Sequence, residues 1–493
     1  MQALPLQAGS FIFIGCYLLS LLIIGWFASR ERRDRSLGDY YLGGRGMGLW
    51  VLMLTLFATQ YSGNALFGFT GQAYRVGFTW LAILHSMIAV VAGYLLFAPQ
   101  LQRLSRQQHF ITPNDYIEYR FPSRALSVLV ALCLIVVLIN YVLAQLKVMG
   151  LMVEGLTGGQ VDAFWGVVVL AIIMMVYSTM GGMRSVAWTD AIQGAMMLTG
   201  FILIALIIER DMGGWAPALG QLSAVAPEKL TPPDGRGAVT WLSTVILIGI
   251  GASVYPQAIQ RIYAARSSQT LRRSLAGMAV LPLFAVVVVL ALGFVAIARF
   301  PGLEGSAADQ VMALIMRDVL STGWFGQAVV TLLLGAILAA LMSTADSALL
   351  SLSSIFAKDI YGKYLRPNAS DAECARVGQW WAWIILGALV WVSTQEDLTL
   401  YRLFVLKFEI LLQIAPAFYL GVNFSSLRAM PLILGLVTGL CVAVSGWSLG
   451  WMPFGLHPGT LGLLVNVLVI MIAQYCYSLN IPTAKISKSP LSE

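Results

Sequence analysis

Long apolar runs are the feature that most constrains what this chain can fold into. Each run holds about 20 residues, the length that a helix needs to cross about 30 Å of hydrocarbon. Of the 493 residues, 59% are hydrophobic and only 11% are charged, whereas a soluble domain carries about 25% charged residues. The runs also lack the period-two alternation of barrel strands. The sequence therefore predicts an all-α protein whose partner is the lipid bilayer.

Thirteen of these runs are predicted to be membrane-spanning helices. The first is expected to be retained, because the N-terminus lacks the basic segment and the cleavage site of a signal peptide. Gly and Pro inside several runs are compatible with helices in a bilayer, where neighbouring groups satisfy the freed backbone. The predicted spans are residues 9–28, 47–69, 78–99, 125–150, 161–180, 186–208, 239–262, 272–298, 324–352, 377–395, 400–425, 430–448 and 458–478.

The net charge of +7 is explained by the side of the membrane on which the basic residues lie. With the N-terminus outside, most Lys and Arg residues fall in inner segments, among them 261–273, which begins with Arg261. Since basic residues concentrate in cytoplasmic loops, this distribution predicts an outer N-terminus and a cytoplasmic C-terminus in a plasma (inner) membrane. No basic stripe alternates with aromatic residues, so nucleic acid is not expected as a partner.

Several kinds of chemistry are excluded by missing motifs. The chain has no phosphate-binding loop of the ATPase type, and no soluble segment long enough for a nucleotide-binding domain. The three histidines, His85, His109 and His457, lack metal-ligand spacing, and no nucleophile elbow occurs. We therefore expect neither an ATP-driven pump nor an enzyme.

Two of the predicted spans are interrupted by polar and small residues. The second span contains Ala-Thr-Gln-Tyr-Ser-Gly-Asn at 58–64, and the seventh contains Gly-Ile-Gly-Ala-Ser-Val-Tyr-Pro-Gln at 249–257. Unwound backbone survives at membrane depth only where it lines a cavity. Paired interrupted spans, five helices apart, are typical of inverted-repeat transporters that bind substrate near the bilayer midplane. Two glycine-softened packing helices would be the alternative.

The ninth predicted span carries a cluster of oxygen-bearing side chains. Ser343, Thr344, Asp346 and Ser347 lie within about one helical turn. A hard cation prefers oxygen ligands, and an aspartate at membrane depth is expected to be paired or liganded. The cluster therefore favours a cation site over simple contacts between helices.

Residues 180–194 carry a Met-Gly-Gly segment followed by Trp-Thr-Asp and Gln-Gly. With the interruption after Ala58, the Ser343-Thr344 pair and the thirteen spans, this segment resembles the sodium:solute symporter family over about residues 9–425. The resemblance implies a ten-helix, 5+5 inverted-repeat core of the leucine-transporter type with two broken helices. It divides the chain into a first helix and basic loop (1–46), a first repeat (47–208), a second repeat (209–425), and two C-terminal helices with a short cytoplasmic tail (426–493).

The same resemblance implies positions for Na+, the expected coupling ion. A first sodium site would use the backbone and hydroxyl groups of Ala58, Tyr61, Ala340, Ser343 and Thr344. The residue pattern points independently to the last two.

A second cation site would use Asp190, Asp346 and Ser347. Asp346 departs from the family pattern, which has a hydroxyl at that position. Gln60 departs as well, since the proline branch has an aspartate near that point.

Solute-binding residues are expected to face the space between the two interruptions. The candidates are polar residues of these segments and of the fourth span: Gln60, Ser62, Asn64, Asn140, Gln145, Tyr255 and Gln257. Each of them has an alternative role in hydrogen bonding between helices. The set contains no arginine, so a strongly anionic solute is disfavoured relative to a zwitterion. Lys407 is expected to reach toward the outer interface, and Glu409 receives no role.

The sequence thus predicts a sodium-coupled secondary symporter that imports a small polar organic solute by alternating access. The solute is expected to be an amino acid, a similar zwitterion or a small carboxylate. The first rival is a proton-coupled carrier on the same fold, with Asp346 or Asp190 as the titrating group. The second is a transporter-like sensor, which would need a separate partner. No obligate protein partner is inferred.

Overall fold

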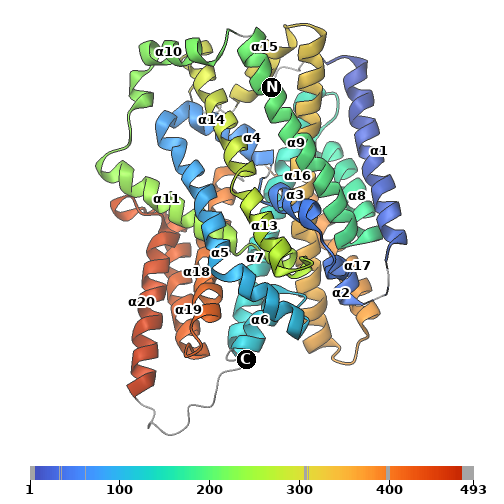
Figure 1. Ribbon diagram of the computed structural model, residues 1–493, viewed down its shortest axis with the longest axis vertical. Coiled ribbons are helices and arrows are strands. Elements are labelled where there is room, and N and C mark those ends of the chain that lie inside the picture. The colour runs from blue at the N-terminus through green and yellow to red at the C-terminus, as the bar shows by residue number, and fades with distance from the viewer. Residues whose placement is uncertain are drawn as a thin grey trace.

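The computed structural model describes residues 6–479 except 33, 35, 62, 212, 305–307, 309 and 396–399, and it leaves the side chains of 63–67, 211, 218 and 400–402 undescribed. The regular secondary structure of the described residues is helical, connected by turns and loops, with one isolated bridge between Met47 and Ala265, which confirms the predicted all-α class. Figure 1 shows the long helices running side by side along the longest axis of the molecule. Twelve helices of the described chain are long and apolar enough to span a membrane.

The helices of the first half of the chain are α1 (Ala8–Arg30), α2 (Leu37–Leu42), α3 (Leu49–Gln60), α4 (Gly63–Val76), α5 (Ala82–Gln108), α6 (Pro113–Arg120), α7 (Arg124–Leu156), α8 (Ala163–Gly181), α9 (Met183–Asp211) and α10 (Trp215–Val225). Those of the second half are α11 (Gly235–Ser253), α12 (Pro256–Ala264), α13 (Ser268–Met278), α14 (Leu281–Arg299), α15 (Val311–Leu320), α16 (Trp324–Ser354), its π-helical continuation η5 (Ile355–Leu365), α17 (Asp371–Ser393), α18 (Leu400–Asn423), α19 (Ala429–Leu449) and α20 (Pro458–Leu479). The exact number of thirteen spans and the repeat boundaries stay predictions.

The predicted span 47–69 is divided between two helices. Helix α3 ends at Gln60, and Tyr61 adopts extended backbone angles before α4 begins at Gly63. The amide of Tyr61 still donates to the carbonyl of Phe57 at 2.9 Å. Because α3 has only 12 residues, it is too short to cross the bilayer alone, and its carboxyl end lies inside the helical bundle.

The second predicted interruption separates α11 from α12. Helix α11 ends at Ser253, Tyr255 has an extended ψ of 130°, and Pro256 is the first residue of α12. Proline suits the first position of a helix because it has no amide hydrogen to satisfy. Its ring also drives the preceding residue out of helical geometry. The sequence Tyr255-Pro256 therefore fixes where this helix breaks.

Helix α16 is the central element that positions the candidate site. It packs against α3, α7, α9 and α12, and every residue from Gly335 to Ser354 is buried. A helix with apolar or small residues on every face must be enclosed by other helices. Its hydroxyl and carboxylate groups are consequently held away from both solvent and lipid.

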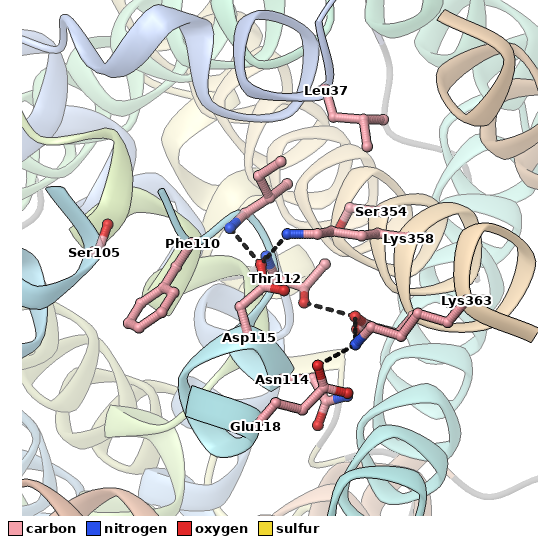
Figure 2. Close-up of polar contacts among 12 residues, drawn as sticks. Leu37, Ser105, Phe110, Thr112, Asn114, Asp115, Glu118, Ser354, Lys358 and Lys363 are labelled. Carbon is pink, nitrogen blue, oxygen red and sulfur yellow. Dashed lines mark hydrogen bonds and ion pairs between the residues drawn. The ribbon is translucent and has the colours of Figure 1, made fainter. Parts of the chain in front are cut away.

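A layer of charged side chains joins α6 to η5, as Figure 2 shows. Asp115 accepts hydrogen bonds from the amides of Ile111 and Thr112 at 2.6 and 2.9 Å, and from the ammonium of Lys358 at 2.7 Å. Lys363 bridges Asp359 and Glu118 in the same layer. The Thr112–Asp115 capping box thus both starts α6 and anchors the end of α16.

Helix α1 lies beside α8 (Figure 1), and glycine residues allow the two helices to approach closely. A Cβ atom on Gly25 would lie 2.7 Å from the Cβ of Tyr177, and one on Gly181 would lie 2.8 Å from the Cβ of Ala28. Small residues at an interface let membrane helices pack backbone to backbone. This contact sets the position of Tyr177, which reaches the polar interior.

Gly25→Ala is expected to destabilise the protein by about 1–3 kcal/mol, because the added methyl group overpacks the contact with Tyr177. Gly15→Ala is the matched control, since nothing lies within 4 Å of a Cβ at this position of the same helix. The measurement is the thermal unfolding midpoint of both purified variants in detergent. Equal midpoints would contradict the close contact.

Candidate functional site

The carboxyl end of α3 contacts the middle of α16 at a site where several carbonyl and hydroxyl oxygen atoms lie close together. The hydroxyl of Ser343 donates toward the carbonyls of Ala58, at 3.3 Å, and Ala340, at 3.1 Å. Ala58, Ser343 and the neighbouring Thr344 are completely buried. Among the described residues, the hydroxyl of Thr344 has no hydrogen-bond partner, although an unpaired buried hydroxyl is unfavourable. Three of the five predicted ligands of the first sodium site are thus in direct contact, and a fourth lies beside them.

This donor set is suited to a small hard cation. Carbonyl and hydroxyl oxygens are the ligands that such ions prefer, and the break after Gln60 frees helical carbonyls that would otherwise be paired. No group of three or more His, Cys, Asp or Glu residues that could hold a metal ion occurs in the described part of the chain. The ring of Tyr61 packs against Phe57, Phe69 and Phe201, which closes this point from one side.

A guanidinium group organises the residues predicted for the second cation site. Arg261 of α12 donates to Asp190 of α9 at 2.7 Å and to Ser347 of α16 at 2.5 Å. It also donates to the hydroxyl of Thr55 in α3 at 2.7 Å and to the carbonyl of Gln257 at 3.0 Å. Both members of the ion pair are completely buried. Asp190 and Ser347 are therefore brought together, with Arg261 between them.

The assignment of Arg261 to an inner loop was wrong. Arg261 is completely buried within α12. In the sequence it precedes Arg266, Arg272 and Arg273, so it looks like the first residue of a basic loop. Only the tertiary fold shows that carboxylate and hydroxyl groups from three other helices surround it.

Asp346 lies on another side of the same cluster. It accepts hydrogen bonds from the hydroxyl of Tyr177 at 2.6 Å and from that of Ser347 at 3.3 Å. One carboxylate oxygen of Asp190, Oδ1, is buried without a partner. With Arg261 balancing Asp190, full ionisation leaves the single negative charge of Asp346 uncompensated, which a bound cation or a proton would neutralise.

A small cavity lies between the two interrupted helices. Its volume is about 20 Å³, and Gln60, Tyr61 and Tyr255 line it together with Tyr141, Phe404, Phe408 and Lys407. Gln60 donates to the hydroxyl of Tyr94 and, at 3.2 Å, to the carbonyl of Ala252. Tyr255 stacks on Tyr141 with ring centroids 5.1 Å apart. Gln60 and Tyr255 thus meet at one cavity, as the sequence predicts.

The remaining predicted solute-binding residues are placed differently. Asn140, Gln145 and Gln257 are buried, carry amide atoms without hydrogen-bond partners, and do not line this cavity. Ser62 and the side chain of Asn64 lie outside the described residues. The solute-binding roles of all these residues stay predictions.

Lys407 is a second residue that sequence reasoning placed incorrectly. Instead of reaching toward the outer interface, its side chain is 2% exposed and lines the cavity. Its ammonium lies 3.7 Å from the ring centroid of Tyr141. The signal in the sequence was an intramembrane ionisable residue, which is a functional candidate by default.

Two interrupted helices that enclose polar side chains inside a membrane bundle define the class of secondary transporters. The sequence profile of the sodium:solute symporter family matches residues 40–430, and the chain belongs to this family. It is a multi-pass membrane transporter, not an enzyme, and it imports a small organic solute with sodium.

Known relatives and structures agree with this assignment. The chain is 29% identical to the osmoregulated proline transporter OpuE of Bacillus subtilis, covering 80% of this chain and 79% of that protein. It is 30% identical to the sodium/pantothenate symporter of Haemophilus influenzae, covering 70% of each. A solved structure of a Na+-coupled sialic acid symporter in a substrate-bound outward-open state has a TM-score of 0.76 at 19% identity, covering 97% of this chain and 99% of that one. The fold is therefore of the leucine-transporter type.

Arg261→Met is expected to lower the free energy of unfolding by about 3–5 kcal/mol, because it leaves Asp190 as an uncompensated buried charge. Arg299→Met is the matched control. It removes an Arg–Asp pair with Asp318 whose side chains are 33% and 40% exposed, and it should change stability by about 0–1 kcal/mol. Denaturation of both variants in detergent compares the two effects, and equal effects would contradict the structural role of Arg261.

Proposed function

We propose that sodium binds where α3 breaks against α16 and that its binding prepares the neighbouring cavity for the solute. The ligands are the carbonyl oxygens of Ala58, Tyr61 and Ala340 and the hydroxyls of Ser343 and Thr344. The observation that carries this proposal is the Ser343 hydroxyl, which contacts the carbonyls of Ala58 and Ala340 at once. A hydroxyl that donates in this way can rotate and present its lone pairs to a cation.

Coupling follows from the position of the sodium ligands on two helices. A cation shared by α3 and α16 stabilises the conformation in which the two helices are correctly spaced. Tyr61 belongs to the sodium set and also lines the solute cavity. If sodium favours the conformation that binds solute, the solute must raise sodium affinity by the same factor.

The solute proposed for this transporter is an amino acid, a similar zwitterion or a small carboxylate. The named relatives transport proline and pantothenate, both of which carry a carboxylate. The cavity adds aromatic faces, an amide and an ammonium group, which suit a compact polar molecule with an apolar part. The distribution of basic residues supports import across a plasma (inner) membrane with the N-terminus outside and the C-terminus in the cytoplasm.

The second proposed cation position lies at Asp346 and Ser347, beside the unpaired oxygen of Asp190. The uncompensated charge of Asp346 supports this position, and Arg261 already neutralises Asp190. A proton on Asp346 would satisfy the same charge requirement. Proton coupling is therefore the second candidate function, and only the identity of the ion distinguishes it from the first.

Ser343→Ala and Thr344→Ala are each expected to raise the sodium concentration for half-maximal uptake about tenfold, the equivalent of about 1.4 kcal/mol in binding. Thr331→Ala is the control, since Thr331 lies on the same helix and bonds to Ser10 of α1. Uptake of radiolabelled proline and pantothenate into proteoliposomes at graded sodium concentrations measures the effect. Unchanged sodium dependence in both variants would exclude this sodium site.

Asp346→Asn is expected to reduce the Hill coefficient of sodium-dependent uptake to about 1, because only one ion still modulates the transport equilibrium. Asp318→Asn, at the partly exposed pair with Arg299, should leave the coefficient unchanged. The same vesicles test the rival function. Uptake driven by a proton gradient in choline buffer, and abolished by Asp346→Asn, would assign proton coupling instead.

A further inference from the structure

Lys407 is a buried basic residue with no anionic partner in the part of the chain that the structure describes. It lies on α18, and its side chain is 2% exposed. No carboxylate pairs with it and no hydrogen bond reaches it anywhere in the described part of the chain. Arg261, which is also deeply buried, has both an ion pair and hydroxyl partners. Lys407 thus lacks the compensation that Arg261 receives.

Aromatic rings take the place of a counter-ion around Lys407. Its ammonium nitrogen lies 3.7 Å from the ring centroid of Tyr141, 4.7 Å from that of Phe404 and 5.0 Å from that of Phe408. The ring of Tyr255 is 5.7 Å away. Each such contact stabilises a cation by about 0.5–2 kcal/mol, but none of them accepts the three N–H groups as a carboxylate would.

The ammonium lines the cavity between the two interrupted helices. Gln60 and Tyr255, from the first and second interruptions, line the same cavity. Its volume of about 20 Å³ admits about one water molecule, so the aromatic rings must move apart to admit an organic solute. The charged group that a solute would meet first in this cavity is Lys407, because every other lining residue is apolar, phenolic or an amide.

We propose that Lys407 is the anchor for the carboxylate of the transported solute. The inference rests on the proposed function and specifies the solute as a molecule with a free carboxylate. Pairing would remove the penalty of an uncompensated buried cation, so the anion is favoured over a neutral analogue of the same shape. It also reverses the expectation, drawn from the absence of arginine, that anionic groups are disfavoured.

The test compares acids with neutral or amidated analogues that lack the carboxylate. The probes are L-proline against L-prolinamide, pantothenate against pantothenyl alcohol, and N-acetylneuraminic acid against its methyl ester. Thermal unfolding of the purified protein in sodium buffer reports binding, because a ligand of the folded state raises its apparent stability. For one of these acids, the concentration that raises the unfolding temperature of the unchanged protein is expected to be at least about tenfold lower than for its analogue. This ratio corresponds to a preference of about 1.4 kcal/mol in binding free energy.

Lys407→Met keeps the length and apolar contacts of the side chain and should abolish this preference. Lys407→Arg keeps the charge and should retain part of it. Lys147→Met is the control, since Lys147 on α7 donates to the carbonyl of Gln395 and does not line the cavity. The inference is overturned if the unchanged protein prefers no acid over its analogue, a result that does not depend on the folding of any variant. It is also overturned if Lys407→Met retains the preference.

Repeating the measurement in choline buffer separates this inference from the proposed function. An acid preference that depends on Lys407 but is equal in sodium and choline supports the carboxylate anchor and contradicts sodium coupling. A sodium-dependent response that ignores the carboxylate supports sodium coupling and contradicts the anchor.

Discussion

The arrangement of the central helices depends on the contacts that the buried guanidinium of Arg261 makes with its neighbours. It binds Thr55 of α3, Asp190 of α9 and Ser347 of α16, and it belongs to α12 itself. A charge in this position is stable only if its partners remain in place. One side chain thus links α3 and α12, which belong to the two interrupted segments, to α16. Ser343, which contacts Ala58, lies one helical turn before Ser347 on α16.

The interior of this protein combines strongly paired and weakly paired polar groups. Arg261, Asp190 and Thr55 are hydrogen-bonded to one another, whereas the side chains of Thr344 and Lys407 make no hydrogen bond within the described part of the chain. Unsatisfied buried groups raise the free energy of the ligand-free protein. This difference suits a transporter. The paired groups hold the helices in place, whereas the unpaired groups are stabilised only when an ion or a solute binds to them.

Sequence reasoning predicted those site features whose chemistry is local. The hydroxyl pair Ser343-Thr344 is adjacent in the chain, and both helix breaks follow from nearby polar, glycine and proline residues such as Pro256. Arg261 and Lys407 were misplaced because their sequence neighbours indicate a loop and an interface. Their partners, Asp190 and Tyr141, lie 71 and more than 200 residues away in the chain, so no local pattern reveals them.

The sequence by itself determined that the chain is a bundle of membrane helices with two interruptions and a cluster of hydroxyls. Hydrocarbon permits only apolar helices of sufficient length, and an aspartate within one of them must be compensated. Only the tertiary structure decided which charges are paired. The stability of a buried ion is set by the side chains that several helices bring within about 4 Å, and that proximity arises from packing rather than from the order of residues.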